Sequence, residues 1–419
     1  MRIALIALGS RGDVQPYLAL GQGLLAAGHA VRVVTNQDYA RLVMAQGLEF
    51  WPVTGSVQAV VESDEMRALL DKGDFLAINA RAAREVQRMA RLWAAEGLAG
   101  CRDRDLLIAG LGGLFMGLAL AEKLGIPLLE AHVVPFTPTA VFPGALFPAA
   151  VARLGGAANR LSHHLTRQIM WQAFRPADTL ARRQVLDLAP APFWGPHTAA
   201  GRRRLPTLYG ISPTVLPKPA DWGAHVHVTG YWTLEAEADW SPPAELLDFL
   251  QRGDPPVYIG FGSMANRDPQ ATADLVLRAL AQTGQRAIIL SGWGGFRAAR
   301  LPDTVLVLES APHAWLFPRV GAVVHHGGAG TTAAGLRAGR PSVVIPFFGD
   351  QPFWGQRVAE LGVGPAPIPR RVLSADRLAR ALRQAMSDPA MRQRAAELGA
   401  RIRAEDGVAR AVAVIEAGV

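Results

Sequence analysis

Three short glycine-containing segments carry the side chains best suited to chemistry. The first, residues 9–16, reads GSRGDVQP and follows an apolar run at residues 3–8. Its two glycines allow the backbone to turn sharply between a strand and a helix. Asp13 then stands near the start of that helix, where a carboxylate is also an ordinary N-cap. The loop does not fit the dinucleotide pattern G-x-G-x-x-G, so the spacing leaves Asp13 open between a cap and a functional group.

The second segment, residues 325–332, has the composition of an anion site. It reads HHGGAGTT and lies between an apolar run at residues 322–324 and a helical pattern. Glycines let a ligand approach the backbone, and the helix start offers free N–H groups and a positive dipole end. His326 and the Thr331 hydroxyl add further donors. We therefore expect a diphosphate here, the alternative being a tight glycine turn beside a buried histidine.

The third segment, residues 347–354, places a carboxylate beside an amide at a helix start. It reads FFGDQPFW, with Asp350 followed by Gln351. Such a pair can bind vicinal sugar hydroxyls, and the aromatic side chains offer apolar faces; helix capping is the alternative. Two lesser features follow other strands: the turn ending at Ser263 could present N–H groups to phosphate, and Trp293 could stack on a flat base or serve in packing.

Alternating strand and helix patterns must position these segments. The pattern runs through both halves of the chain and is typical of a parallel sheet with crossover helices. A proline- and tryptophan-rich stretch separates the halves. We expect an α/β protein of two doubly wound, Rossmann-like domains facing each other across a cleft, with ligands outside the carboxyl ends of the strands. The expected ranges are 1–215 for an acceptor domain, 216–256 for a linker, 257–400 for a nucleotide-sugar domain and 401–419 for a helix that packs back on the first domain.

Composition excludes several function classes. The formal charge of +8 comes mostly from arginine, and no basic stretch is interleaved with aromatics, so we expect no nucleic-acid partner. The single Cys101 cannot form an internal disulfide, which suits a cytoplasmic protein. The apolar run at residues 3–8 is too short for a secretory signal. The D-x-D triplet at residues 103–105 precedes a strand instead of following one, so we expect no metal site there.

An apolar, proline-rich segment at residues 133–152 is the best candidate for acceptor binding. Four prolines between residues 131 and 152 argue against a membrane-spanning helix. Phe136, Phe142 and Phe147 are expected to line a pocket for a flat or long apolar molecule. The following stretch, residues 154–183, mixes apolar and arginine faces and would flank that pocket or contact a membrane surface. Core packing explains both segments nearly as well.

These stretches together resemble the GT-B superfamily of nucleotide-diphosphate-sugar glycosyltransferases. The resemblance is carried by GSRGDVQPYLAL, by APHAWLFPRVGAVVHHGGAGTTAAGLRAGRP and by PFFGDQPFWGQRV. Within the superfamily, the chain looks most like sterol glucosyltransferases and the enzymes that glycosylate polyketide, macrolide and glycopeptide antibiotics. Asp13 is similar to the general base of these enzymes and is the candidate catalytic residue. The candidate donor-binding residues are Ser10, Gly12, Ser263, Trp293, His313, His326, Gly328, Gly330, Thr331, Asp350 and Gln351.

The resemblance implies an inverting, metal-independent hexosyltransferase. It would move a hexose, glucose above all, from a UDP-sugar to a hydroxyl of a hydrophobic sterol or polyketide. The sugar nucleotide is a co-substrate, and no other cofactor is expected. Plant relatives carry a ribose-binding glutamate where this chain has Ala334, which leaves a TDP-sugar open. A sugar-nucleotide 2-epimerase and a non-catalytic partner protein of the same fold are the rival interpretations; peripheral membrane contact is a further expectation, and the oligomeric state is left undetermined.

Overall fold

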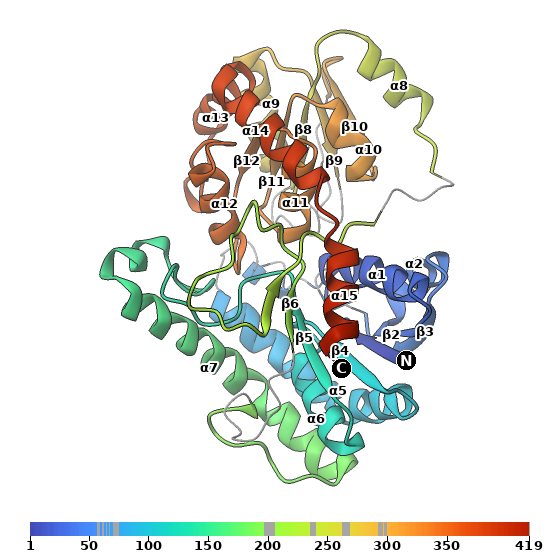
Figure 1. Cartoon of the computed structure of the whole chain (residues 1–419). Coiled ribbons are helices and arrows are strands. Elements are labelled where there is room, and N and C mark those ends of the chain that lie inside the picture. Colours follow the sequence, from blue (N-terminus) through green and yellow to red (C-terminus); the bar gives the residue numbers. More distant parts are fainter. Residues whose placement is uncertain are drawn as a thin grey trace. The chain divides into compact units, whose positions relative to one another are not determined.

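The computed structural model divides the chain into two compact units, each of which is described by itself. Unit 1 comprises residues 1–60, 76–234 and 405–419, and unit 2 comprises residues 61–75 and 235–404 (Figure 1). The described residues are 1–56, 59–60, 63, 65–66, 68–69, 75–196, 206–234, 240–261, 269–291, 296 and 300–418.

Unit 1 is built on a parallel sheet whose described strands run in the order β3-β2-β1-β4-β5-β6-β7. All neighbouring strands are parallel. The central strands are short apolar runs buried on both faces, as a sheet covered by helices requires. Their bounds are β1 Arg2–Ile6, β2 Ala30–Asn36, β3 Glu49–Val53, β4 Leu106–Ala109, β5 Leu128–His132, β6 Thr207–Tyr209 and β7 Val226–Val228.

Helices cover both faces of this sheet. One face packs against α1, α2 and α15, and the other packs against α5, α6 and the end of α7. The C-terminal helix α15 lies along α1 (Figure 1). Its first residue, Gly407, approaches Gly230 so closely that a Cβ there would lie 2.4 Å from the Gly230 carbonyl carbon. The bounds are α1 Arg11–Ala26, η1 Gln37–Tyr39, α2 Ala40–Ala45, α5 Phe75–Cys101, α6 Leu114–Leu124, η2 Ala149–Leu154, α7 Gly156–Ala181, η3 Arg182–Leu186 and α15 Gly407–Gly418.

Unit 2 contains a second parallel sheet with its described strands in the order β10-β9-β8-β11-β12. Helices α9 and α13 pack on one face, and α8, α10 and η5 pack on the other. The strands are β8 Val257–Gly260, β9 Ala287–Leu290, β10 Val305–Leu308, β11 Ala322–His325 and β12 Ser342–Val344. The helices are α8 Ala244–Gln251, α9 Pro269–Thr283, α10 His313–Leu316, η5 Phe317–Arg319, α11 Ala329–Arg337, α12 Gln351–Glu360, η6 Arg370–Val372, α13 Ala375–Ser387 and α14 Pro389–Arg403.

The stretch expected as a linker contains regular structure. Strand β7 lies within residues 216–256 and pairs with β6, so the first sheet extends beyond residue 215. Helix α8 lies in the same stretch and belongs to unit 2. A strand of three residues such as β7 carries too little periodic pattern to be found from sequence. No helix in the described part of the chain has the length and apolar character needed to span a bilayer.

Candidate active site

The first loop of unit 1 leaves the sheet where the strand order reverses. Strand β1 lies between β2 and β4, and Ile6 near its end pairs with Ala109 at the end of β4. The loops after β1 and β4 therefore leave the same end of the sheet, and the helices that follow them, α1 and α6, pack on opposite faces. In open α/β sheets, this is where ligands bind.

Asp13 is held in this loop by the residue three positions before it. Its Oδ2 atom accepts hydrogen bonds from the Ser10 N–H and from the Ser10 hydroxyl, each at 2.8 Å. Gly9 has a φ of +136°, and a Cβ there would lie 2.5 Å from Asp13 Oδ2. Only glycine leaves room for this arrangement. The second carboxylate oxygen, Oδ1, has no hydrogen-bond partner in the described part of the chain.

The environment of Asp13 favours its protonated form. Burial raises the pKa of the carboxyl group, and the two hydrogen bonds from Ser10 lower it by a smaller amount. A carboxylate with a raised pKa is a stronger base than an exposed aspartate. Asp13 is thus a helix-capping residue and at the same time a candidate proton acceptor.

A second glycine loop packs against the loop that carries Asp13, and its role was not predicted from the sequence. It spans residues 110–113 after β4. A Cβ at Gly112 would lie 1.9 Å from the Leu8 carbonyl oxygen, and one at Gly113 would lie 2.6 Å from that of Ile6. The two loops therefore lie backbone against backbone. Three glycines directly after a buried strand were the signal that could have identified it.

The three candidate acceptor residues lie in different surroundings. Phe136 is buried, with the Arg167 guanidinium 4.8 Å from its ring centre and the His132 ring 5.4 Å away. It therefore serves in core packing. Phe142 and Phe147 are partly exposed. The Phe142 ring also packs edge-on against His163, with 5.7 Å between the ring centres.

Asp221 holds the segment that carries these phenylalanines. Its carboxylate accepts hydrogen bonds from the Thr139 hydroxyl at 2.7 Å, the Ala140 N–H at 2.8 Å and Arg160 at 2.9 Å. Although burial opposes it, these donors lower the pKa of Asp221 to about 2. The segment is therefore fastened by an ionised carboxylate throughout the physiological pH range.

In unit 2, the candidate donor-binding loops leave a single edge of the sheet. His325, at the end of β11, pairs with Gly260 at the end of β8 and with Val344 at the end of β12. The strand order reverses between β8 and β11, so the loop after His325 also lies at a topological switch point. Residues 325–328 and 347–351 are thereby brought together although they are separated in sequence.

The two histidines of this loop are neutral; His325 is buried and His326 is half-buried. The Gly327 N–H donates to His325 Nδ1 at 3.0 Å, which leaves the proton of His325 on Nε2. Burial lowers the pKa of His325 well below its usual value and that of His326 to about 4. In the described part of the chain, neither His325 Nε2 nor His326 Nδ1 has a hydrogen-bond partner. Unpaired buried polar atoms of this kind are rare unless a ligand or water completes them.

Glycines shape the start of α11. Gly327 has a φ of +93°, and a Cβ at Gly328 would lie 2.5 Å from His326 Nε2. Gly328 is the N-cap of α11, and the Thr332 N–H donates to its carbonyl oxygen at 2.9 Å. The helix has no acidic residue in its first turn. The first N–H groups and the positive end of the helix dipole therefore remain available for an anion. Thr331 is partly exposed and Gly330 exposed at this end.

Asp350 and Gln351 lie at the start of α12 with different tasks. Asp350 Oδ2 accepts a hydrogen bond from the Trp354 indole N–H at 2.7 Å. Gln351 is buried, and its Oε1 accepts the N–H groups of Phe347 at 2.8 Å and Phe348 at 3.2 Å. Gln351 thus holds the loop in shape, whereas Asp350 is partly exposed beside it.

Five candidate donor-binding residues remain: His313, Ser263, Trp293, Ser10 and Gly12. The His313 ring stacks on Phe317 at 4.4 Å between centroids, and its Nε2 lies 3.2 Å from the Tyr258 hydroxyl. Ser263 and Trp293 lie outside the described residues. In unit 1, Ser10 is the partner of Asp13, and Gly12 is exposed next to it.

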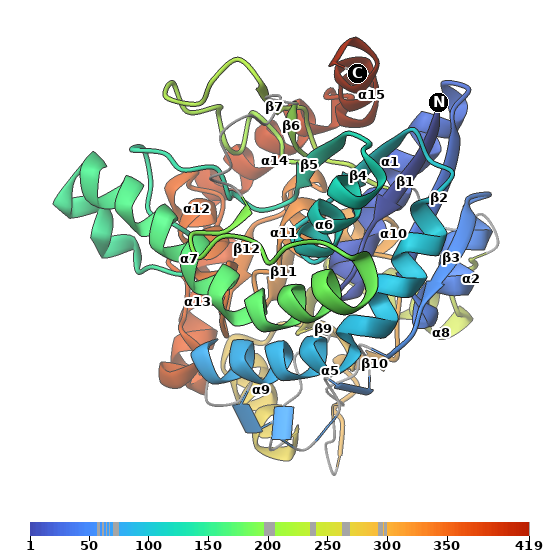
Figure 2. The same cartoon turned by 90° about the horizontal axis from the view of Figure 1, so that it is seen from below.

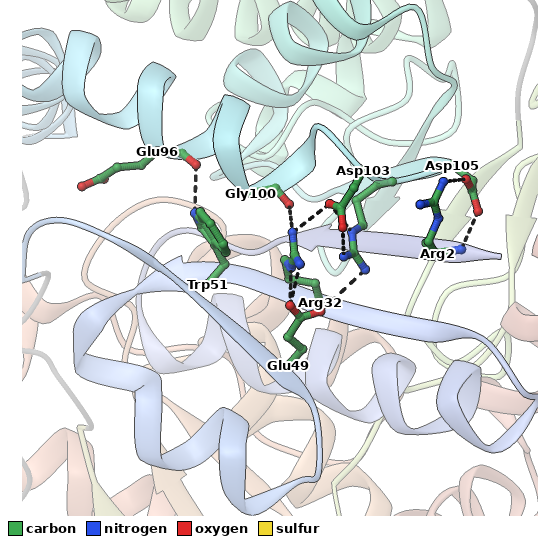
Figure 3. A network of polar contacts seen from close by, with 9 residues as sticks. Arg2, Arg32, Glu49, Trp51, Glu96, Gly100, Asp103 and Asp105 are labelled. Atoms are coloured by element: carbon green, nitrogen blue, oxygen red, sulfur yellow. Dashed lines mark hydrogen bonds and ion pairs between the residues drawn. The ribbon is translucent and has the colours of Figure 1, made fainter.

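The D-x-D triplet has a structural explanation. Asp103 contacts Arg32 at 3.0 Å and Arg104 at 2.6 Å, and Asp105 contacts Arg2 at 2.8 Å. Figure 3 shows these carboxylates in a chain of ion pairs. The network lies where β4 begins, opposite the end from which the Asp13 loop leaves. Among the described residues, no three His, Cys, Asp or Glu side chains are grouped to hold a metal.

Comparison with protein families matches both halves of the chain. Residues 3–143 match the glycosyltransferase family 28 N-terminal domain, and residues 275–416 match the Erythromycin biosynthesis protein CIII-like C-terminal domain. The chain is 39% identical to sterol 3-beta-glucosyltransferase UGT80B1 of Arabidopsis thaliana, over 98% of this chain and 67% of that protein. It is 38% identical to the sterol 3-beta-glucosyltransferase of Aspergillus fumigatus, over 99% of this chain but only 30% of that protein. The chain thus spans about two thirds of the plant relative and less than a third of the fungal one.

Solved structures share the fold. The calicheamicin glycosyltransferase CalG4 superposes with a TM-score of 0.65 at 20% identity, covering 100% of this chain and 98% of that one. The Streptomyces glycosyltransferase SsfS6, complexed with thymidine diphosphate, gives a TM-score of 0.64 at 21% identity, covering 100% and 99%. The GT-B architecture expected from the sequence is therefore confirmed.

Proposed function

Because the chain belongs to the glycosyltransferase family that includes the sterol 3-beta-glucosyltransferases, we propose that it transfers a hexose from a nucleoside diphosphate to a hydroxyl of a lipophilic acceptor. Glucose is the sugar and UDP the carrier that we favour, with TDP as the alternative. The acceptor class is a sterol or a sterol-like polyketide. The reaction inverts the anomeric carbon.

The observation that carries this proposal is the glycine loop before α11. It combines a helix start without acidic residues with buried imidazole nitrogens that have no protein partner in the described part of the chain. A diphosphate supplies acceptors for both kinds of donor. A bound diphosphate would also raise the low pKa of His326, because a nearby negative charge favours the protonated imidazole.

The leaving group develops its charge at the same place. As the glycosidic bond breaks, the diphosphate gains negative charge at the start of α11. Fixed N–H groups aimed at developing charge stabilise a transition state without reorganisation. We propose that the helix start and His326 supply this stabilisation, so that the reaction proceeds without a metal ion. Asp350, held by Trp354, accepts hydrogen bonds from the sugar hydroxyls.

Asp13 is the proposed general base. Its Oδ2 is occupied by Ser10, and Oδ1 takes the proton of the acceptor hydroxyl as the oxygen attacks the anomeric carbon. Base catalysis of this kind contributes about 10²- to 10⁴-fold. The partly exposed Phe142 and Phe147 are the proposed contacts of the apolar acceptor.

A product screen tests the assignment. The purified chain is incubated with UDP- and TDP-hexoses and with sterols, macrolides and flavonoids, and products are identified by mass spectrometry. A sterol or polyketide glycoside with inverted configuration by NMR supports the proposal. Interconversion of sugar nucleotides without any acceptor product would favour the epimerase instead.

A further inference from the structure

The first half of helix α7 buries polar side chains and exposes apolar ones, the reverse of an ordinary surface helix. In its first half the inward face is polar, with Asn159, Ser162, His163 and Thr166 all buried; the buried Trp171 lies further along the helix. Its outward face carries Leu161, Leu165 and Ile169, which are 58%, 43% and 36% exposed. Residues four apart lie on one side of a helix, so these three side chains form a stripe. A soluble helix normally buries its apolar stripe.

The stripe continues beyond the helix at both ends. Leu154, at the end of η2, is 75% exposed, and Phe193 and Trp194 are 52% and 66% exposed. The Phe193 carbonyl accepts hydrogen bonds from three side chains of α7, which fix the aromatic pair against the helix; these are Gln168, Trp171 and Gln172. We call Leu154, Leu161, Leu165, Ile169, Phe193 and Trp194 the apolar ridge.

The ridge is prominent within unit 1. Helix α7 and η2 contact each other, and together they project from the side of this unit (Figures 1 and 2). Seven of the thirteen strongly exposed large apolar side chains in the described part of the chain lie between residues 141 and 194. Contiguous exposed apolar surface of this size marks an interaction site.

Positive charge predominates around the ridge. Residues 131–177 contain no aspartate or glutamate. Arg153 and Arg160 lie exposed near the start of α7, and Asp221, from another segment, contacts Arg160. Arg167 does not contribute to the surface because it is packed over Phe136. An occupant of the ridge must therefore accept apolar side chains next to a net positive charge, because Asp221 pairs with Arg160 and leaves Arg153 as the second cation.

We propose that η2, the outer face of α7 and the Phe193–Trp194 pair dock on a lipid bilayer that carries anionic headgroups. The leucines and the aromatic pair would enter the boundary between headgroups and acyl chains, where phenylalanine and tryptophan are favoured. Arg153 would contact lipid phosphates. A second copy fits less well, because a symmetric contact of this face would bring the two Arg153 side chains together, and residues 131–177 offer no carboxylate to pair with them.

Vesicle flotation tests the docking surface without using catalysis, so the result is independent of the proposed function. The probes are vesicles of phosphatidylcholine alone and of phosphatidylcholine with about one third phosphatidylglycerol. The wild-type chain should bind the anionic vesicles, and Leu161→Glu/Leu165→Glu should weaken binding at least about tenfold. The matched control is Leu25→Glu/Leu92→Glu, because both leucines are 43% exposed on other helices.

Two further variants complete the test. Trp194→Ala removes one exposed ring without adding charge and should weaken binding in the same direction. Arg153→Gln should reduce the preference for anionic over neutral vesicles. Equal binding by both leucine double variants overturns the proposal, as does binding that ignores the anionic lipid. Sedimentation velocity provides the other contradiction: a dimer of the wild type that Leu161→Glu/Leu165→Glu abolishes would show that a second copy covers the ridge.

Discussion

Replacement of Asp13 by asparagine separates proton transfer from structure. In the wild type, one oxygen of Asp13 accepts two hydrogen bonds from Ser10 and leaves the other oxygen for the acceptor. Asparagine keeps one oxygen for Ser10 and places an NH₂ group where the base stood. The helix cap is therefore retained, and the group that takes the proton is lost.

The expected loss in turnover follows from the role. A positioned general base contributes about 10²- to 10⁴-fold, which corresponds to roughly 2.7 to 5.4 kcal/mol of transition-state free energy. Stability should change in the opposite direction. Burial raises the pKa of Asp13 in the folded protein, so the stabilisation present below its unfolded pKa is lost as pH rises through the folded pKa. At pH 7, the asparagine variant should unfold at the same temperature as the wild type or at a higher one.

Three measurements check the variant: initial rates of acceptor glycosylation, UDP affinity by calorimetry and thermal unfolding. The expected result is a large fall in kcat with nearly unchanged UDP affinity and no loss of stability. The matched variant is Ser10→Ala, which keeps the carboxylate but removes a hydrogen bond that lowers its pKa. Its activity should rise with pH through a midpoint above that of the wild type and approach the wild-type rate at high pH.

A clear result would refute this reasoning. If Asp13→Asn retains a turnover within about threefold of the wild type, the carboxylate is only a helix cap, because a lost base costs far more. If the variant loses UDP affinity as well as turnover, Asp13 acts on the donor and the assignment of the base is wrong.

The donor site gives three further predictions. His326→Ala should weaken UDP binding by about 10- to 100-fold, as the loss of a charge-assisted hydrogen bond implies, and unchanged affinity by calorimetry would contradict the phosphate contact. Gly328→Ala should also weaken binding although it keeps the histidine, because the added Cβ would lie 2.5 Å from its Nε2; Gly330→Ala, which has nothing within 4 Å of its Cβ, is the control that should bind normally. Activity should persist in excess EDTA, and complete loss that Mg²⁺ or Mn²⁺ restores would overturn the metal-free mechanism.

Local sequence patterns were enough to place the fold class and the main candidate segments. Short apolar runs followed by glycine and polar residues predict strands that end at a site, because buried parallel strands must be apolar and their loops must turn sharply. Helix α12 begins at Gln351, at the helix start expected for Asp350 and Gln351. The short strands β6 and β7 were not found, since three residues show no period.

Residue types and their local spacing specify which chemical groups the chain offers: glycine turns, an aspartate after the first strand, and paired histidines before a helix. What each group does depends on contacts between segments that are distant in sequence. Strand register places the ends of β8, β11 and β12 in one row, which no local pattern encodes. The same structure occupies Gln351 Oε1 with backbone N–H groups, buries Phe136 and turns the leucines of α7 outward. Those outcomes depend on which distant segments pack against a side chain, and packing is a property of the whole fold.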